Sequence, residues 1–290
     1  MKDKIFDAEF FKKLENISIN ARMPMTEGAS GGRKSKAKGS SVEFSDFREY
    51  ALGDDFRRID WNAYGRFDKL FVKLFMEERE ALVNIFIDCS KSMDYGEQHK
   101  GVCALKLAAV LSYLALNNLD RVCINRMVGD NLAPSISYMG RGMFSRTVDF
   151  LQQTEFSGST NLSNAIKKKD LKQRGISILI SDFFTKGSLE EAIKYLVYKR
   201  QEVILIHILS KEEIEPELNG QVRLIDVETS EDVTISVTPK LLKLYRDKFN
   251  SFTNNLKKQT KRFNGSFLQI CSEEPLEKII FEHFTKEGII

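Results

Sequence analysis

The stretch that decides the fold is VNIFIDCSKSM, residues 83–93. Its first five residues are apolar except for one asparagine, and the run ends at an acid, Asp88, which hydroxyls follow at Ser90 and Ser92. A short run that is apolar at nearly every position is typical of a strand covered on both faces of a sheet. The sequence therefore predicts a buried strand at residues 83–88 that ends in one carboxylate and two hydroxyls.

The pattern around this strand repeats along the chain. From about residue 80 onward, short runs rich in β-branched residues alternate with helical patterns, which is typical of parallel strands joined by crossover helices. Further strands are expected at residues 121–127, 135–139, 176–181, 203–209 and 266–270. Helices are expected at residues 100–118, 161–169 and 188–200, with a long one starting near Pro239. We therefore predict an α/β fold, with a mainly parallel sheet and helices on both faces.

Two regions depart from this pattern. The run GQVRLIDVETSEDVTIS alternates in two halves around a turn, which predicts a β-hairpin inserted at about residues 212–237. Near the N-terminus, an amphipathic helix at about residues 8–17 precedes a glycine-rich basic loop at residues 22–41. A stretch dense in charges and aromatics follows that loop. We therefore expect an N-terminal helical and extended segment, residues 1–80, and an α/β domain, residues 81–290.

Composition limits the classes of function. The chain has 44 basic and 41 acidic residues and a net charge of +3, so no overall field would hold it on nucleic acid or a membrane. The N-terminus lacks the apolar core of a signal peptide, and no uninterrupted apolar run reaches the roughly 18 residues of a membrane span. We therefore expect a cytoplasmic protein. The four cysteines follow no metal-binding spacing and the three histidines lie far apart, so neither predicts a metal site.

Polar residues from two further elements are expected beside Asp88. In an open parallel sheet, ligands bind in the crevice outside the carboxyl ends of the strands. Thr160 stands at the start of a predicted helix, and Asp182 follows the predicted strand at residues 176–181. With the strand order 3-2-1-4-5-6, the first and fourth strands are neighbours. Asp88 and Asp182 would therefore flank the point where the strand order reverses.

These side chains form an all-oxygen set of possible metal ligands: Asp88, Ser90, Ser92, Thr160 and Asp182. Oxygen ligands suit a hard divalent cation such as Mg²⁺ or Mn²⁺ better than they suit zinc or copper. Each residue also has an ordinary interpretation, since Asp and Ser form turns and Thr160 could cap the helix that follows it. Taken together they predict a metal site with at least one open coordination position.

The same five residues resemble the metal-ion-dependent adhesion site (MIDAS) of von Willebrand factor type A (vWA) domains, whose pattern is Asp-x-Ser-x-Ser, then Thr, then Asp. That family usually has glycines before the threonine, where this chain has Gly158 and Ser159. The resemblance implies a three-layer, Rossmann-like fold. It also implies a bound cation whose open position accepts a Glu or Asp side chain of a partner protein.

A second resemblance covers the segment before the domain. The stretch GSSVEFSDFREYALGDDFRRIDWNAYGRFDKLFVKLFMEERE resembles the signature of the bacterial family called domain of unknown function 58 (DUF58). This resemblance implies work with MoxR-type AAA+ ATPases as a chaperone-like adaptor. Within the stretch we expect Trp61 to be a packing anchor. We expect the charged residues to form ion pairs that fasten the segment to the domain: Asp54, Asp55, Arg57, Arg58, Asp60 and Arg66.

Three classes of function follow from these observations. The preferred one is a non-catalytic, metal-dependent protein-binding adaptor, because the chain has no G-x-x-x-x-G-K-[ST] nucleotide loop. The alternative is a Mg²⁺-dependent phosphohydrolase with Asp88 as nucleophile, although Ser90 stands where such enzymes usually carry a second acid. The third is nucleic-acid binding through the basic loop at residues 22–41. The near-neutral total charge and the lack of aromatics in that loop argue against it.

Overall fold

The chain divides into two compact units. The computed structural model describes residues 12–14, 17–19, 43–76, 81–96, 99–185, 187–227 and 231–290. The first unit comprises Met1–Ala21 and Ala81–Ile290, and the second comprises Arg22–Glu80. The basic loop predicted at residues 22–41 lies outside the described residues. Of the helix predicted at residues 8–17, residues 12–14 are helical and most of the others lie outside the described part of the chain.

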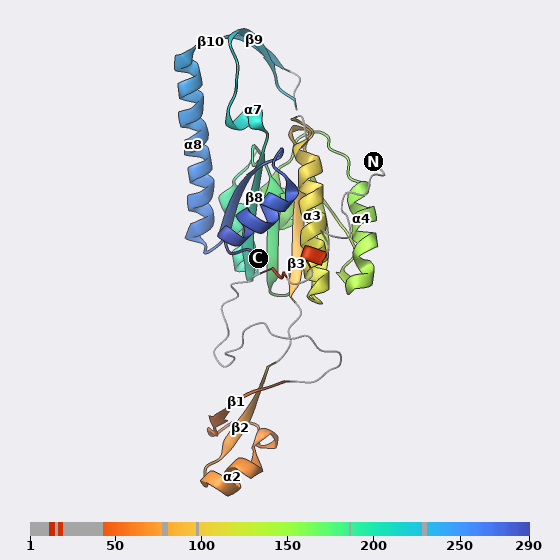
Figure 1. The fold of residues 1–290 in the computed structure, drawn as a ribbon, viewed down its shortest axis with the longest axis vertical. Coiled ribbons are helices and arrows are strands. Elements are labelled where there is room, and N and C mark those ends of the chain that lie inside the picture. Colours follow the sequence, from red (N-terminus) through yellow and green to blue (C-terminus); the bar gives the residue numbers. More distant parts are fainter. Residues whose placement is uncertain are drawn as a thin grey trace. The chain divides into compact units, whose positions relative to one another are not determined.

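The first unit is built on a mainly parallel sheet (Figure 1). Its strands are β3 (Leu82–Asp88), β4 (Arg121–Val128), β5 (Asn131–Pro134), β6 (Tyr138–Met139), β7 (Gly175–Ser181), β8 (Gln201–Leu209) and β11 (Ser266–Cys271). The order is β11-β8-β7-β3-β4-β5, with β6 paired to β4, and only β5 and β6 are antiparallel to their neighbours. When β6 is left out and the other strands are numbered in chain order, the sheet read from β5 to β11 has the predicted order 3-2-1-4-5-6.

Helices cover both faces of this sheet, which confirms the predicted fold class. The helices of the unit are α3 (Lys100–Asn117), α4 (Phe144–Gln152), α5 (Leu162–Lys167), α6 (Leu189–Tyr198), α7 (Lys211–Ile214), α8 (Pro239–Arg262), α9 (Leu276–Lys278) and the π-helical η4 (Ile279–Phe284). One buried cluster joins Phe86 of β3 and Leu205 of β8 to residues of α5, α6 and α8. Among the described residues α3 contributes nothing to that cluster, although it contacts β3 and β4, so it covers the other face.

The core helix α3 also has the length and apolar composition of a membrane span, and in the described part of the chain it is the one helix that does. Inside the molecule, 72% of that stretch is buried. Its apolar residues therefore pack against the sheet and against α4. Figure 1 shows α3 in front of β3, with α4 beside it.

A glycine permits the pairing of β3 with β7. A Cβ atom at Gly175 would lie 2.2 Å from the carbonyl oxygen of Leu82, which is far inside contact distance. Without a side chain at this position, the two strands pair in parallel from Leu82 with Gly175 to Ile87 with Ile180. The residues that follow both strands therefore meet at one edge of the sheet.

The single strand predicted at residues 135–139 is wrong. The chain instead forms β5 just before this range and β6 at its end, separated by residues 135–137. Pro134 has no N–H to continue a ladder, and the Ser135 hydroxyl accepts the bond from the N–H of Ile124 at 2.9 Å. The side chain thus takes the place of a backbone acceptor and ends the regular pairing.

The predicted hairpin and long helix are both present. Strands β9 (Gly220–Ile225) and β10 (Asp232–Val237) pair antiparallel. Thr238 then caps α8 by accepting from the N–H of Leu241 at 3.2 Å, and Pro239 occupies the first turn. Proline fits there because the first N–H groups of a helix have no partner within the helix.

The second unit is a hairpin with a short helix. Strands β1 (Glu43–Glu49) and β2 (Phe71–Met76) pair antiparallel, and α2 (Trp61–Phe67) lies between them in the chain. Asp54 pairs with Arg48 at 2.7 Å and Asp60 with Lys73 at 3.2 Å. Asp60 also caps α2. Asp54 and Asp60 therefore form ion pairs within their own unit, and the prediction that the charged residues fasten this unit to the α/β domain stays a prediction.

Trp61 is the clearest correction in this unit. The residue is 64% exposed in its own unit, so it is not a packing anchor within the described part of that unit. That part, a hairpin and a seven-residue helix, holds two buried apolar residues, Ile59 and Val72.

A buried histidine yields a prediction about stability. His207 of β8 is fully buried among the rings of Phe183, Phe184, Phe252 and Phe267, and burial lowers its pKa from 6.5 to about 4. As the pH falls, the imidazole therefore binds a proton in the unfolded chain before it does so in the folded chain. Stability is lost as the pH falls from about 6.5 toward 4.

Replacing His207 by Phe should remove this loss, which is on the order of 2 kcal/mol at pH 5. Urea unfolding of both proteins at pH 7.5 and pH 5 measures it. The wild type should lose more stability than His207→Phe. Equal losses would show that the histidine does not stay neutral in the folded chain.

Candidate metal site

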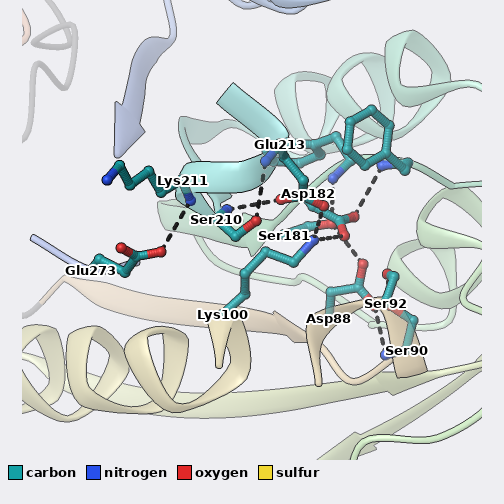
Figure 2. A network of polar contacts seen from close by, with 12 residues as sticks. Asp88, Ser90, Ser92, Lys100, Ser181, Asp182, Ser210, Lys211, Glu213 and Glu273 are labelled. Atoms are coloured by element: carbon teal, nitrogen blue, oxygen red, sulfur yellow. Dashed lines mark hydrogen bonds and ion pairs between the residues drawn. The ribbon is translucent and has the colours of Figure 1, made fainter. Parts of the chain in front are cut away.

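Asp88, the first predicted ligand, is the last residue of β3 and is 2% exposed. Its Oδ2 accepts a hydrogen bond from Ser181 Oγ at 2.6 Å, and its Oδ1 accepts one from the N–H of Ser90 at 3.0 Å. Ser181 ends the neighbouring strand β7. Two separate elements therefore hold the carboxylate in a fixed orientation (Figure 2).

The two predicted serine ligands lie in the loop after β3. Their hydroxyl oxygens, Ser90 Oγ and Ser92 Oγ, are 3.0 Å apart. Ser90 is also the N-cap residue of a short 3₁₀ helix, η2 (Lys91–Met93), but its side chain makes no cap hydrogen bond. The hydroxyls thus point toward each other beside Asp88, as Figure 2 shows.

Thr160 lies in a loop that backbone hydrogen bonds hold against the other segments of the site. The N–H of Lys91 donates to the carbonyl oxygen of Gly158 at 2.8 Å, and the N–H of Gly129 donates to that of Ser159 at 3.0 Å. These bonds hold the loop of Thr160 against the loop that carries Ser90 and Ser92, and against the end of β4. The structure therefore brings the Thr160 segment to the same edge of the sheet as Asp88.

The hydroxyl of Thr160 does not cap the following helix, so that expectation is wrong. Asn161 is the cap of α5, with its side chain accepting from the N–H of Asn164 at 3.2 Å. Thr160 Oγ1 instead donates a long bond, 3.4 Å, to the carbonyl oxygen of Met127. As a donor in that bond, the hydroxyl keeps its lone pairs available for a cation.

Asp182 follows β7 directly and is fully buried. Its Oδ2 accepts from Lys100 Nζ at 2.8 Å, and its Oδ1 accepts from the N–H of Phe184 at 3.1 Å. Lys100, the first residue of α3, is 1% exposed and donates a second bond, 2.6 Å, to Glu213 Oε1. Asp182 is therefore not an ordinary loop acid but one member of a buried ion network (Figure 2).

The two aspartates differ in their electrostatic surroundings. Burial raises the pKa of Asp88, and the neighbouring Asp182 carboxylate raises it further, against hydrogen bonds that act to lower it. For Lys100, burial acts to lower the pKa, but the carboxylates of Asp182 and Glu213 outweigh burial and the pKa is raised. Among the described residues, Asp88 accepts hydrogen bonds but has no ion pair. The negative charge that lacks a counter-ion is therefore the one on Asp88.

The hydroxyl geometry fits a hard divalent cation. Mg²⁺ binds oxygen at about 2.1 Å, so neighbouring ligands of an octahedral ion lie about 3.0 Å apart. Ser90 Oγ and Ser92 Oγ have this separation, 3.0 Å. Within the described ranges no group of three or more His, Cys, Asp or Glu side chains could hold a metal. A metal site in this part of the chain therefore depends on hydroxyl ligands.

The formal charges fit as well. Asp88, Asp182 and Glu213 carry three negative charges when ionised, and Lys100 carries one positive charge. The difference, three minus one, leaves two negative charges in a buried site. One divalent cation would neutralise them, and burial of unbalanced charge is costly.

Three polar residues of this site were missed by the sequence reasoning: Lys100, Ser181 and Glu213. Lys100 has a signal in the sequence, because it is a cation at the first position of an apolar helix, where the helix dipole disfavours positive charge. Glu213 belongs to a capping box with Ser210, which the spacing Ser-x-x-Glu predicts. Its second contact, with Lys100, joins distant segments and has no local signal.

Fold and site together define an α/β protein with a candidate ligand-binding crevice at the carboxyl edge of a mainly parallel sheet. The family model described as "Protein of unknown function DUF58" matches residues 46–258. This match covers more than half of the chain, so the chain belongs to the DUF58 family. All five candidate ligands and most of the described second unit lie inside the match.

Several known proteins are similar to the chain. Uncharacterized proteins of Mycobacterium bovis and Mycobacterium tuberculosis are 24% identical over 248 residues, which cover 83% of this chain and 78% of theirs. The crystal structure of BatB from Bacteroides thetaiotaomicron has a TM-score of 0.44 and 14% identity, covering 72% of this chain and 98% of that one. The SpRpn10 VWA domain has a TM-score of 0.35 and 15% identity, covering 68% and 92% respectively.

The buried network predicts a large effect of one substitution. Replacing Lys100 by Met leaves Asp182 and Glu213 without their shared cation, which should cost about 3 kcal/mol of unfolding free energy. Urea unfolding followed by circular dichroism measures the loss. A matched control is Lys194→Met, because Lys194 pairs with Glu190 at 2.9 Å with its side chain 56% exposed. That variant should lose less than about 1 kcal/mol, and equal losses would contradict the role of Lys100.

Proposed function

We propose that the chain is a non-catalytic adaptor that binds a partner protein through a divalent cation, Mg²⁺ or Mn²⁺. The residues that would hold it are Asp88, Ser90, Ser92, Thr160 and Asp182. The observation that carries the proposal is the pair of serine hydroxyls 3.0 Å apart, beside a buried carboxylate with no ion pair in the described part of the chain. A bound cation would supply an open position for a carboxylate of the partner.

The surroundings of the site also favour an acidic partner. Helix α8 is joined to the site through Tyr245, whose hydroxyl donates to the carbonyl oxygen of Glu213 at 2.6 Å. The exposed residues in the half of α8 that contains Tyr245 include one acid, Asp247, and four bases: Lys240, Lys243, Arg246 and Lys248. A positive surface beside a site raises the rate at which an acidic partner arrives.

The partner that the family resemblance favours is a MoxR-type AAA+ ATPase, acting together with a client that donates the acidic residue. The chain has no nucleotide loop of its own, so ATP hydrolysis would come from the ATPase. We propose that the pair works in the chaperone-like assembly or maturation of protein complexes in the cytoplasm.

The test is a pull-down from lysate of the native host, with Mg²⁺ or with EDTA. The wild type should retain the ATPase only with Mg²⁺, and Asp88→Ala should fold but lose both the ATPase and Mg²⁺ binding measured by calorimetry. A matched control is Asp94→Ala, at an exposed acid near the site whose partner is His99. Unchanged capture of the ATPase by Asp88→Ala would refute the proposal.

The alternative, a phosphohydrolase with Asp88 as nucleophile, is less well supported. The residue two positions after Asp88 is Ser90 rather than an acid. The one base in the network, Lys100, is committed to two carboxylates. The site therefore lacks a general acid for a leaving group.

A phosphatase assay separates the two functions. With p-nitrophenyl phosphate and Mg²⁺, the wild type should show no turnover above that of Asp88→Asn. Turnover that Asp88→Asn abolishes would instead support the phosphohydrolase.

A further inference from the structure

The ammonium group of Lys100 is shared between two carboxylates from separate segments (Figure 2). Its Nζ donates to Asp182 Oδ2 at 2.8 Å and to Glu213 Oε1 at 2.6 Å. Asp182 is one of the residues that would hold the cation, whereas Glu213 lies in α7 and is not a candidate ligand. One ion pair of Lys100 therefore involves the candidate metal site, and the other does not.

The backbone of Lys100 is fixed, but its charge can shift. The N–H of Lys100 donates to the carbonyl oxygen of Tyr95 at 3.0 Å, and the residue is the first of α3. Its side chain is a flexible four-carbon stem that ends in three N–H donors. Nζ can therefore move toward Glu213 and away from Asp182 while the helix stays in place.

Glu213 is held in a position that suits this exchange. Its Oε2 accepts from the N–H of Ser210 at 2.8 Å, and its own N–H donates to Ser210 Oγ at 3.3 Å. Its carbonyl oxygen accepts from the hydroxyl of Tyr245 at 2.6 Å. These contacts fix the residue and use Oε2 of its carboxylate, so Oε1 is the oxygen that Lys100 binds.

A cation on Asp182 would have to compete with Lys100. The other hydrogen bond to Asp182 comes from the N–H of Phe184, which carries no net charge. The side chains of Lys100 and Asp182 are both 1% exposed, and two positive charges repel each other strongly where water is excluded. In the absence of a cation, Lys100 neutralises Asp182. With a cation in the site, Glu213 is the carboxylate that remains for the ammonium group.

On the basis of the function proposed above, we propose that Lys100 competes with the cation for Asp182 and that Glu213 limits this competition. Neither residue is a candidate ligand, and the two have opposite effects. Lys100 lowers the affinity of the site for a divalent cation. Glu213 raises that affinity, because it draws the ammonium group away from Asp182. A site regulated in this way keeps its fold when it is empty and releases its cation readily.

The first test is calorimetric titration of the purified full chain with MgCl₂ and with MnCl₂. Glu213→Gln should bind the cation at least about tenfold more weakly than the wild type, because Asp182 becomes the only charged partner of Lys100. Glutamine keeps the contact with Ser210, since a capping box accepts Glu or Gln. The matched control is Glu212→Gln, which removes the same charge at an exposed residue of α7. It should change the affinity by less than about threefold, because solvent screens exposed charges.

The second test uses the opposite substitution. Lys100→Met should bind the cation at least about tenfold more tightly than the wild type. Mg²⁺ should also raise its melting temperature by more than that of the wild type, because tighter binding stabilises the folded chain more. The matched control is Lys91→Met, at an exposed lysine in the loop that carries Ser90 and Ser92, which should bind like the wild type. If Lys100→Met does not fold, Lys100→Gln replaces it, with an amide that still donates hydrogen bonds and the same expected direction.

This proposal and the proposed function fail in different ways. If the wild type binds the cation and the variants at 100 and 213 bind no differently from their controls, the competition is refuted and the proposed function stands. Weaker binding in both variants would also refute the competition, because it would show general damage to the site. If neither the wild type nor Lys100→Met binds Mg²⁺ or Mn²⁺, both proposals are wrong. Binding by Lys100→Met alone would support the competition.

Discussion

The parallel pairing of β3 with β7 is the constraint on which the candidate site depends. The two strands approach closely because Gly175 has no side chain, and they lead to helices on opposite faces of the sheet. Their carboxyl ends therefore lie side by side at the edge of the sheet where such folds bind ligands. The 2.6 Å bond from Ser181 to Asp88 joins the two strand ends directly. Residues far apart in the sequence become neighbours through this pairing.

The charged groups at this edge of the sheet differ in role: some are explained by stabilising ion pairs, and Asp88 is not. A buried ion pair accounts for Asp182, Lys100 and Glu213, because each has a partner of opposite charge. It does not account for Asp88, whose partners are hydroxyl and N–H donors and whose pKa burial raises. A buried carboxyl group with a raised pKa and no ion pair among the described residues is typical of binding and catalytic sites. The case for function therefore rests on Asp88 rather than on the larger ion network.

Much of the fold was predictable because its signals are local, whereas contacts between distant residues were not. The apolar run at residues 83–88 gave β3 within one residue, since burial on both faces leaves a continuous pattern. Thr160 could have capped the helix that follows it, but the side chain of the adjacent Asn161 accepts the hydrogen bond from the helix N–H instead. Lys100 pairs across the fold, which no local pattern encodes. Trp61 was expected to be a packing anchor, but it is exposed in the described part of its unit, which has few buried apolar residues.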